Sequence, residues 1–357
     1  MSRQSKAALA AVVGILIGLG TLAGVIYVLR ESDTGGSAEP LPFTGLTDLG
    51  DTGIVTVVEP PSPADLTETI EVGRFPNALT VGEGSVWVMK EGTRVLRIDP
   101  ATGTIVKRID VGFSIGSERP CGIDAGEGAV WVTSFEGHVV RIDPETNEVT
   151  AVVDLLDPSC VAAGAGGIWV TSASNGTIIR IDPVTNEITD EIPLGSFPQG
   201  VAVGAGSVWV ASSAPPDGVE GFVSRIDPET GEVIATIAVN HLPEYLAVGA
   251  RGVWVTANDG TIRRISPRTN QLVGLPIGVS GGGRTVVAVG GGIVWASAIQ
   301  SADVAGEIVQ VDPVSYEVSG EPIPVGEGAL GIDWGAGSLW VANSSDATLS
   351  RYTPPSP

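Results

Sequence analysis

A tryptophan recurs seven times along this chain, at intervals of 38 to 45 residues. The seven copies are Trp87, Trp131, Trp169, Trp209, Trp254, Trp295 and Trp340. A second marker, an Asp-Pro pair or its equivalent, keeps step with them and stands at Asp99, Asp143, Asp182, Asp227, Ser266, Asp312 and Thr353. Two independent markers that share a period of about 40 residues indicate that copies of one supersecondary unit are stacked side by side.

The fourth copy shows what the unit is. Its apolar segments predict strands over 199–203, 207–210, 222–226 and 232–239, and Gly-rich or Asp-Pro turns separate the first from the second and the third from the fourth. The Val-Trp-Val segments are apolar without alternation, as expected where a sheet is covered on both faces. Four antiparallel strands repeated seven times predict an all-β fold, a seven-bladed β-propeller.

The two ends of the repeat region complement each other. The segment Thr67–Gly73 matches the fourth strand of the first unit, 104–112, but no first three strands precede it. The last unit ends after its third strand, Thr348–Tyr352. We therefore expect 67–72 to pair with that strand and close the ring, which leaves no open sheet edge. The propeller then occupies residues 66–354.

The N-terminal region has a different composition. Residues 7–29 carry no charge and are long enough for one helix to cross about 30 Å of hydrocarbon. Arg3 and Lys6 precede this run, and the positive-inside rule places the N-terminus in the cytoplasm and the bulk of the chain outside. We expect a single-pass transmembrane helix within residues 1–30 and a Pro- and Gly-rich linker at 31–65. The alternative is secretion after cleavage of a signal peptide.

Composition excludes several function classes. The formal net charge of −22 repels phosphate backbones, so nucleic acid is not an expected partner. The chain has only three lysines, which leaves no polybasic lipid-binding cluster. It has two histidines and two cysteines, too few for a His- and Cys-rich metal site, so no metal or cofactor is expected.

The repeat, with its Gly-x-Gly-x-Val-Trp-Val and Arg-Ile-Asp-Pro-x-Thr-Asn segments, resembles the YVTN-type repeats of bacterial extracytoplasmic propellers. It is also similar to virginiamycin B lyase-like propellers. The first resemblance implies a surface or periplasmic binding role. The second implies metal-assisted opening of a lactone ring with His and Glu ligands and a His base, but no His-x-Glu cluster stands at matching positions.

Candidate binding residues are expected where the repeats differ from one another, around the mouth of the central channel. This mouth face carries the fourth-to-first and second-to-third loops, and the longer second-to-third loops of the fourth and sixth units rise on it. The predicted ligand-binding residues are Arg74, Asn77, Glu118, Arg119, Asp157, Gln199, Tyr245 and Arg284. The expected ligand is a protein, a peptide or a cell-wall glycan.

Candidates for catalysis are few. His241 with Glu244 is the local acid–base pair, and His138 is expected about three blades away, where it would face His241 across the channel mouth. The alternative to a binding module is therefore a lyase- or hydrolase-type enzyme with a divalent metal at the channel mouth.

Two further expectations concern recurring residues. Cys121 and Cys160 occupy nearly the same place in adjacent units, where first strands converge, and an extracytoplasmic location favours a disulfide between them. An arginine recurs two positions before most of the turn aspartates. We expect these arginines to pair with acids on the fourth strand, such as Glu148, Glu187 and Glu232.

Overall fold

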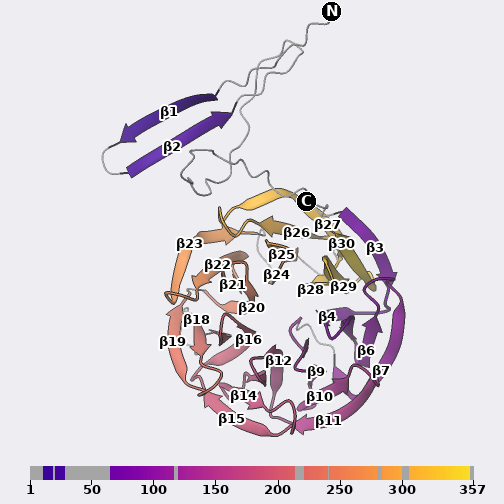
Figure 1. The fold of residues 1–357 in the computed structure, drawn as a ribbon. Helices are drawn as coiled ribbons and strands as arrows, with labels where there is room; N and C mark the ends of the chain where they lie inside the picture. Colours follow the sequence, from indigo (N-terminus) through magenta and orange to yellow (C-terminus); the bar gives the residue numbers. More distant parts are fainter. Residues whose placement is uncertain are drawn as a thin grey trace, which may run out of the picture. The chain divides into compact units, whose positions relative to one another are not determined.

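The computed structural model describes residues 11–18, 21–28, 65–115, 120–213, 221–239, 241–279, 284–299 and 305–353. Contacts divide the chain into two units, Met1–Pro60 and Pro61–Pro357. The larger unit is a ring of seven four-stranded antiparallel sheets around a central channel, which confirms the predicted seven-bladed propeller (Figure 1).

Each blade runs from an innermost strand at the channel to an outermost strand at the outer circumference of the ring. The first three blades are β4 (Pro76–Gly82), β5 (Ser85–Lys90), β6 (Gly92–Ile98) and β7 (Ile105–Ile115); β8 (Ile123–Gly126), β9 (Ala129–Ser134), β10 (His138–Asp143) and β11 (Glu148–Asp154); and β12 (Pro158–Gly164), β13 (Gly167–Ser172), β14 (Thr177–Ile181) and β15 (Ile188–Pro193).

The next three blades follow the same order. They are β16 (Phe197–Gly204), β17 (Ser207–Ser213), β18 (Phe222–Ile226) and β19 (Val233–Ala238); β20 (Pro243–Gly249), β21 (Gly252–Ala257), β22 (Thr261–Ser266) and β23 (Gln271–Gly278); and β24 (Arg284–Gly290), β25 (Ile293–Ile299), β26 (Ala305–Val311) and β27 (Val318–Glu327). The strands of the fourth blade lie within a few residues of their predicted positions.

The seventh blade joins the two ends of the repeat region. It consists of β28 (Ala329–Gly335), β29 (Ser338–Asn343), β30 (Thr348–Thr353) and the N-terminal strand β3 (Asp65–Glu71). β3 pairs antiparallel with β30, with Ile70 opposite Leu349 and Glu71 opposite Thr348. The predicted ring closure is confirmed.

The recurring tryptophan has two structural tasks. All seven side chains are fully buried between blades. In five blades the indole Nε1 also donates a hydrogen bond to the carbonyl of the glycine that ends the innermost strand; Trp87 to Gly82, at 3.0 Å, is one example. A buried indole N–H needs such a partner. One residue type therefore both fills the core and fixes the adjoining turn.

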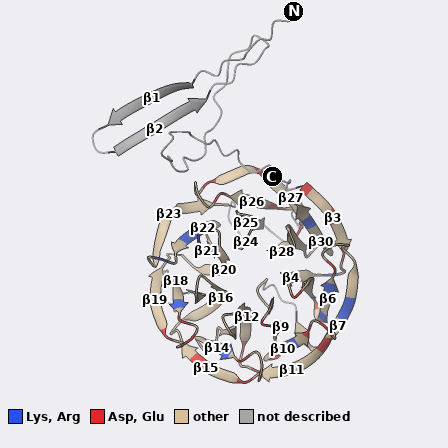
Figure 2. Ribbon diagram, in the orientation of Figure 1, with Lys and Arg blue, Asp and Glu red and all other residues tan. Residues whose placement is uncertain are grey.

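Among the described residues the expected pairing with a fourth-strand acid occurs once, between Arg180 and Asp190 at 3.7 Å. The recurring arginines do not pair with Glu148, Glu187 or Glu232. Their guanidinium groups lie over the tryptophan rings, as Arg97 does over Trp87 at 5.2 Å from the ring centroid. Arg97 also donates to Asn147 Oδ1 in the next blade at 2.8 Å, and Arg225 makes the equivalent bond to Asn270. The planar guanidinium can stack and donate at once, which favours this site over an exposed carboxylate. Figure 2 marks these arginines in blue on third strands such as β14, β18 and β22.

In the N-terminal unit the structure shows two antiparallel strands, β1 (Ala11–Gly18) and β2 (Thr21–Val28), in the stretch for which the sequence predicts one helix. The described residues include no helix of the length and apolar character needed to cross a membrane.

Candidate functional site

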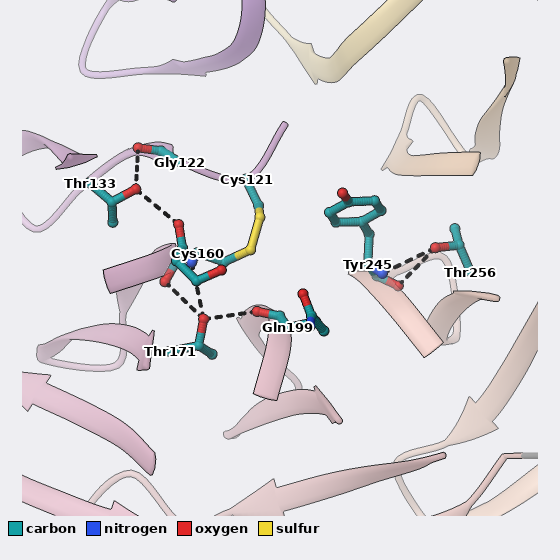
Figure 3. Close-up of a disulfide and its surroundings, with 9 residues drawn as sticks. Cys121, Gly122, Thr133, Cys160, Thr171, Gln199, Tyr245 and Thr256 are labelled. Atoms are coloured by element: carbon teal, nitrogen blue, oxygen red, sulfur yellow. Dashed lines mark hydrogen bonds between the residues drawn. A yellow bond between two sulfur atoms is a disulfide. The ribbon is translucent and has the colours of Figure 1, made fainter. Parts of the chain in front are cut away.

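A disulfide links Cys121 and Cys160 on the mouth face of the channel, which confirms the predicted bond (Figure 3). Their Cα atoms lie 4.8 Å apart, within the usual range for a disulfide. The bond joins the segment leading into β8 to the innermost strand β12, and so links blades two and three. A backbone hydrogen bond of 3.0 Å from Val161 N to Cys121 O reinforces the same junction.

Two threonine hydroxyls continue this connection from blade to blade. Thr133 Oγ1 of blade two donates to Ser159 O of blade three at 2.9 Å, and Thr171 Oγ1 of blade three donates to Gln199 O of blade four at 2.8 Å. Thr133, Thr171 and Gln199 lie close to the disulfide in Figure 3. These links join the starts of the innermost strands of blades two, three and four into one part of the channel rim.

The predicted binding residues are spread around this rim. Asn77 and Tyr245 are buried, Gln199 is half-buried, and Arg74 and Asp157 are exposed. Tyr245 and Cys121 pack against one apolar cluster. Arg284 begins β24, while Glu118 and Arg119 lie outside the described residues. Of this set, Tyr245 alone contributes to the wall of the channel cavity in the described part of the chain.

Each of the two histidines lies beside an aspartate. His138 Nδ1 lies 2.9 Å from Asp154 Oδ1, and its ring packs against Phe113. His241 Nε2 lies 3.5 Å from Asp259 Oδ2, a carboxylate that also binds Arg263 at 2.9 Å.

Hydrogen bonds from Arg263 and Thr261 lower the pKa of Asp259 to about 2 against a cost of burial, so it stays ionised. Neither histidine lines the channel cavity, as far as the structure describes its wall. Glu244 is half-buried on β20.

The channel itself holds a cavity of about 260 Å³ whose wall includes residues of all seven innermost strands. Most of this wall consists of alanine, valine, leucine, isoleucine and glycine. Besides Tyr245, three polar side chains interrupt the described wall, Asp333 on β28, Thr80 on β4 and Asp124 on β8, and they come from the consecutive blades seven, one and two. We call these three residues the channel triad.

Hydrogen bonds tie the channel triad together. Thr80 Oγ1 lies 3.1 Å from Asp124 Oδ1. Burial and, after it, the nearby charge of Asp124 together raise the pKa of Asp333 to about 7, against hydrogen bonds from the Val81 and Trp334 amides and from Thr80 that lower it. Burial also raises the pKa of Asp124. The channel thus contains a pair of carboxyl groups able to hold a proton near neutrality.

Sequence analysis missed the channel triad because it searched the mouth and not the middle of the innermost strands. The signal is present in the repeat. Seven residues before each tryptophan stand Thr80, Asp124, Ala162, Ala202, Ala247, Ala288 and Asp333. Four blades have alanine there, and the three adjacent exceptions are polar. No group of three or more His, Cys, Asp or Glu able to hold a metal is found among the described residues.

Comparison with known proteins shows the fold and no family. No protein-family model and no curated protein sequence matches the chain. Among solved structures, it is similar to hydrazine synthase of Kuenenia stuttgartiensis, with a TM-score of 0.65 and 12% identity over 79% of this chain and 96% of the other. It is also similar to BamB from Moraxella catarrhalis, with a TM-score of 0.53 and 14% identity over 78% and 85% of the two chains. These neighbours are consistent with a β-propeller.

Proposed function

We propose that this chain is a membrane-anchored, extracytoplasmic binding propeller that recognises a protein or peptide segment on its mouth face. One observation carries the proposal. Four large apolar side chains are exposed in the mouth-face loops or strand starts of the four consecutive blades one to four: Phe75 (40%), Phe135 (54%), Leu156 (66%) and Phe197 (40%). Exposed aromatic groups held on a rigid scaffold are the usual anchors of protein interfaces.

Local backbone geometry supports this reading at Phe75. Its φ of 51° lies in the left-handed region, which costs free energy for a bulky residue. Its side chain nevertheless stays partly exposed, with the Arg74 guanidinium 5.2 Å from the ring centroid. Strain of this kind is kept where the surrounding structure enforces it, often at binding sites.

The charges beside these apolar groups indicate the kind of partner. Glu136, Asp154 and Asp157 are exposed next to Phe135 and Leu156. An acidic rim around apolar anchors complements a segment that carries lysine or arginine beside large apolar side chains. The glycan ligand and the metal-dependent lyase remain alternatives that rest on the resemblance to YVTN-type and virginiamycin B lyase-like propellers.

The location is part of the proposal. Residues 7–29 form an uncharged run of membrane-spanning length with basic residues before it. In a bilayer an isolated two-stranded hairpin would leave its outer backbone groups unpaired, and a helix satisfies them all. We therefore propose that this run anchors the propeller and that the linker at 31–65 follows it. Protease added to intact cells should remove the propeller, whereas full protection would contradict the topology.

The binding role is tested by selecting peptides from a random displayed library on the full chain. We expect enrichment of peptides that combine basic and large apolar residues, and we expect their affinity to fall at least tenfold in the variant Phe135→Ser, Leu156→Ser. The matched control is Val184→Ser, which removes an 85% exposed apolar side chain from a third-to-fourth turn on the opposite face. Equal loss in both variants, or no enrichment, would refute this mode of binding.

A further inference from the structure

The channel triad bridges the junctions between blades as well as lining the cavity. Asp333 Oδ2 of blade seven accepts a hydrogen bond from Val81 N of blade one at 2.8 Å. Asp124 Oδ2 of blade two accepts one from Ala163 N of blade three, also at 2.8 Å. The hydroxyl of Thr80 connects blade one to blade two. These side chains therefore link four consecutive blades.

One of these junctions is where the ring closes. Blade seven contains β3 from the start of the propeller and β28 to β30 from its end, and β4 of blade one follows β3 along the chain. The bond from Val81 N to Asp333 lies on the channel side of this junction. Each carboxylate is also fixed by its own strand, since Trp334 N donates to Asp333 at 2.7 Å and Ala125 N donates to Asp124 at 2.9 Å.

No described cation faces this pair. The strands β12, β16, β20 and β24 contribute alanine, valine, leucine and glycine to the cavity wall, and Tyr245 is the only other titratable side chain that the structure describes there. The acids in the nearby turns, Glu83 and Glu127, bind the amides of Gly128 and Gly166 in the following blades. Two carboxylates in an apolar channel without a described cation repel each other when both are ionised.

We propose that Asp124 and Asp333 hold one proton between them and release it as pH rises, so that the ring-closing junction is tighter in mildly acidic than in alkaline solution. This inference concerns the channel and stands independently of the mouth-face partner. A shared proton removes the repulsion while each carboxyl keeps oxygen acceptors for the blade-to-blade amides. Loss of that proton leaves two negative charges that repel each other, and one of them, on Asp333, lies at the junction where the chain closes its ring.

The sign of the effect follows from linkage. The pKa of Asp333 is raised in the folded protein to about 7 from an ordinary value of 3.8. Its contribution to stability is therefore fully present below pH 3.8 and is lost as pH rises to about 7. The size of this pKa shift limits the increase in the unfolding equilibrium constant, as pH rises across this range, to about 10³-fold.

The first experiment measures proton release in the unmodified full chain. Infrared difference spectroscopy should show a protonated carboxyl band that disappears with a midpoint near pH 7. In Thr80→Val the midpoint should move to higher pH, because the hydroxyl favours the ionised form of both carboxyls. A carboxyl band that disappears entirely around pH 4 would overturn the proposal.

The second experiment measures denaturant unfolding between pH 4 and pH 8. Wild-type stability should fall across this range, and Asp333→Asn should remove most of that fall. Asp65→Asn, which neutralises an exposed carboxyl on β3, is the matched control and should keep it. If Asp333→Asn retains the full dependence on pH, or if Asp333→Asn and Asp65→Asn behave alike, the proposal fails. Should Asp333→Asn not fold, the infrared titration decides alone.

Discussion

Breaking the disulfide should destabilise the propeller by an amount that its position in the chain allows us to work out. Cys121 and Cys160 are 39 residues apart, so the bond closes a loop of that size in the unfolded chain. The chain-entropy model gives about 4 kcal/mol for a loop of about 40 residues. The folded state also loses a covalent link between blades two and three next to the 3.0 Å hydrogen bond from Val161 N to Cys121 O.

The assay compares denaturant unfolding of the full chain with and without a reductant, which leaves every side chain in place. We expect reduction to lower the free energy of unfolding by about 4 kcal/mol at most, because strain in the folded state subtracts from the entropic gain. The double variant Cys121→Ala, Cys160→Ala should lose a similar amount and should not respond to reductant. Hydrogen exchange at the Val161 amide should become faster than at the Ala163 amide.

Two results would refute this reasoning. Free thiols in the denatured, non-reduced protein would show that the bond is absent. An unchanged unfolding midpoint after confirmed reduction would show that the two blades are held together without it. A response of the double variant to reductant would mean that the assay measures something other than this bond.

Two other predictions concern the ring and its blade junctions. Deleting residues 50–72, which include β3, should leave an open ring that aggregates or melts at a much lower temperature, and an unchanged melting temperature would contradict the pairing with β30. Ile70→Ala should lower the free energy of unfolding by about 2–4 kcal/mol in a denaturation experiment, because Ile70 is buried in the blade-seven core. Arg97→Met should lower the free energy of unfolding by about 2 kcal/mol, since it removes charged hydrogen bonds to the next blade. Arg180→Met should lower it less, because the structure describes bonds of Arg180 within its own blade; equal losses of stability in both variants would show that stacking of the arginine on tryptophan dominates.

The sequence predicts the architecture because every blade repeats the same local sequence features. Glycine in the first-to-second turn and Asp-Pro in the third-to-fourth turn fix the connections, and the apolar Val-Trp-Val segments show that both faces are covered. The orphan strand at 67–72 and the missing strand after Tyr352 make closure of the ring predictable. The disulfide was also predictable, since the two cysteines occupy matched positions in neighbouring units.

The partners of side chains at blade junctions were less predictable, because they depend on which part of the neighbouring blade lies next to each side chain. The recurring arginine was assigned to acids of its own blade, yet Arg97 and Arg225 reach the turn of the following blade and stack on tryptophan. Charge and spacing alone do not say which of several acceptors is within reach. The aspartate partners of His138 and His241, Asp154 and Asp259, were likewise not expected from the sequence.

What the sequence by itself determined is the number of blades, the order of their strands, the closure of the ring and the bond between the two cysteines. These features follow from local patterns that repeat and so can be compared with one another. Only the tertiary structure decided that Asp124, Thr80 and Asp333, residues up to 253 positions apart, meet in one apolar channel. Burial raises the pKa of both aspartates, and the charge of Asp124 adds to the shift of Asp333; both causes exist only once the ring has brought the first, second and seventh blades together.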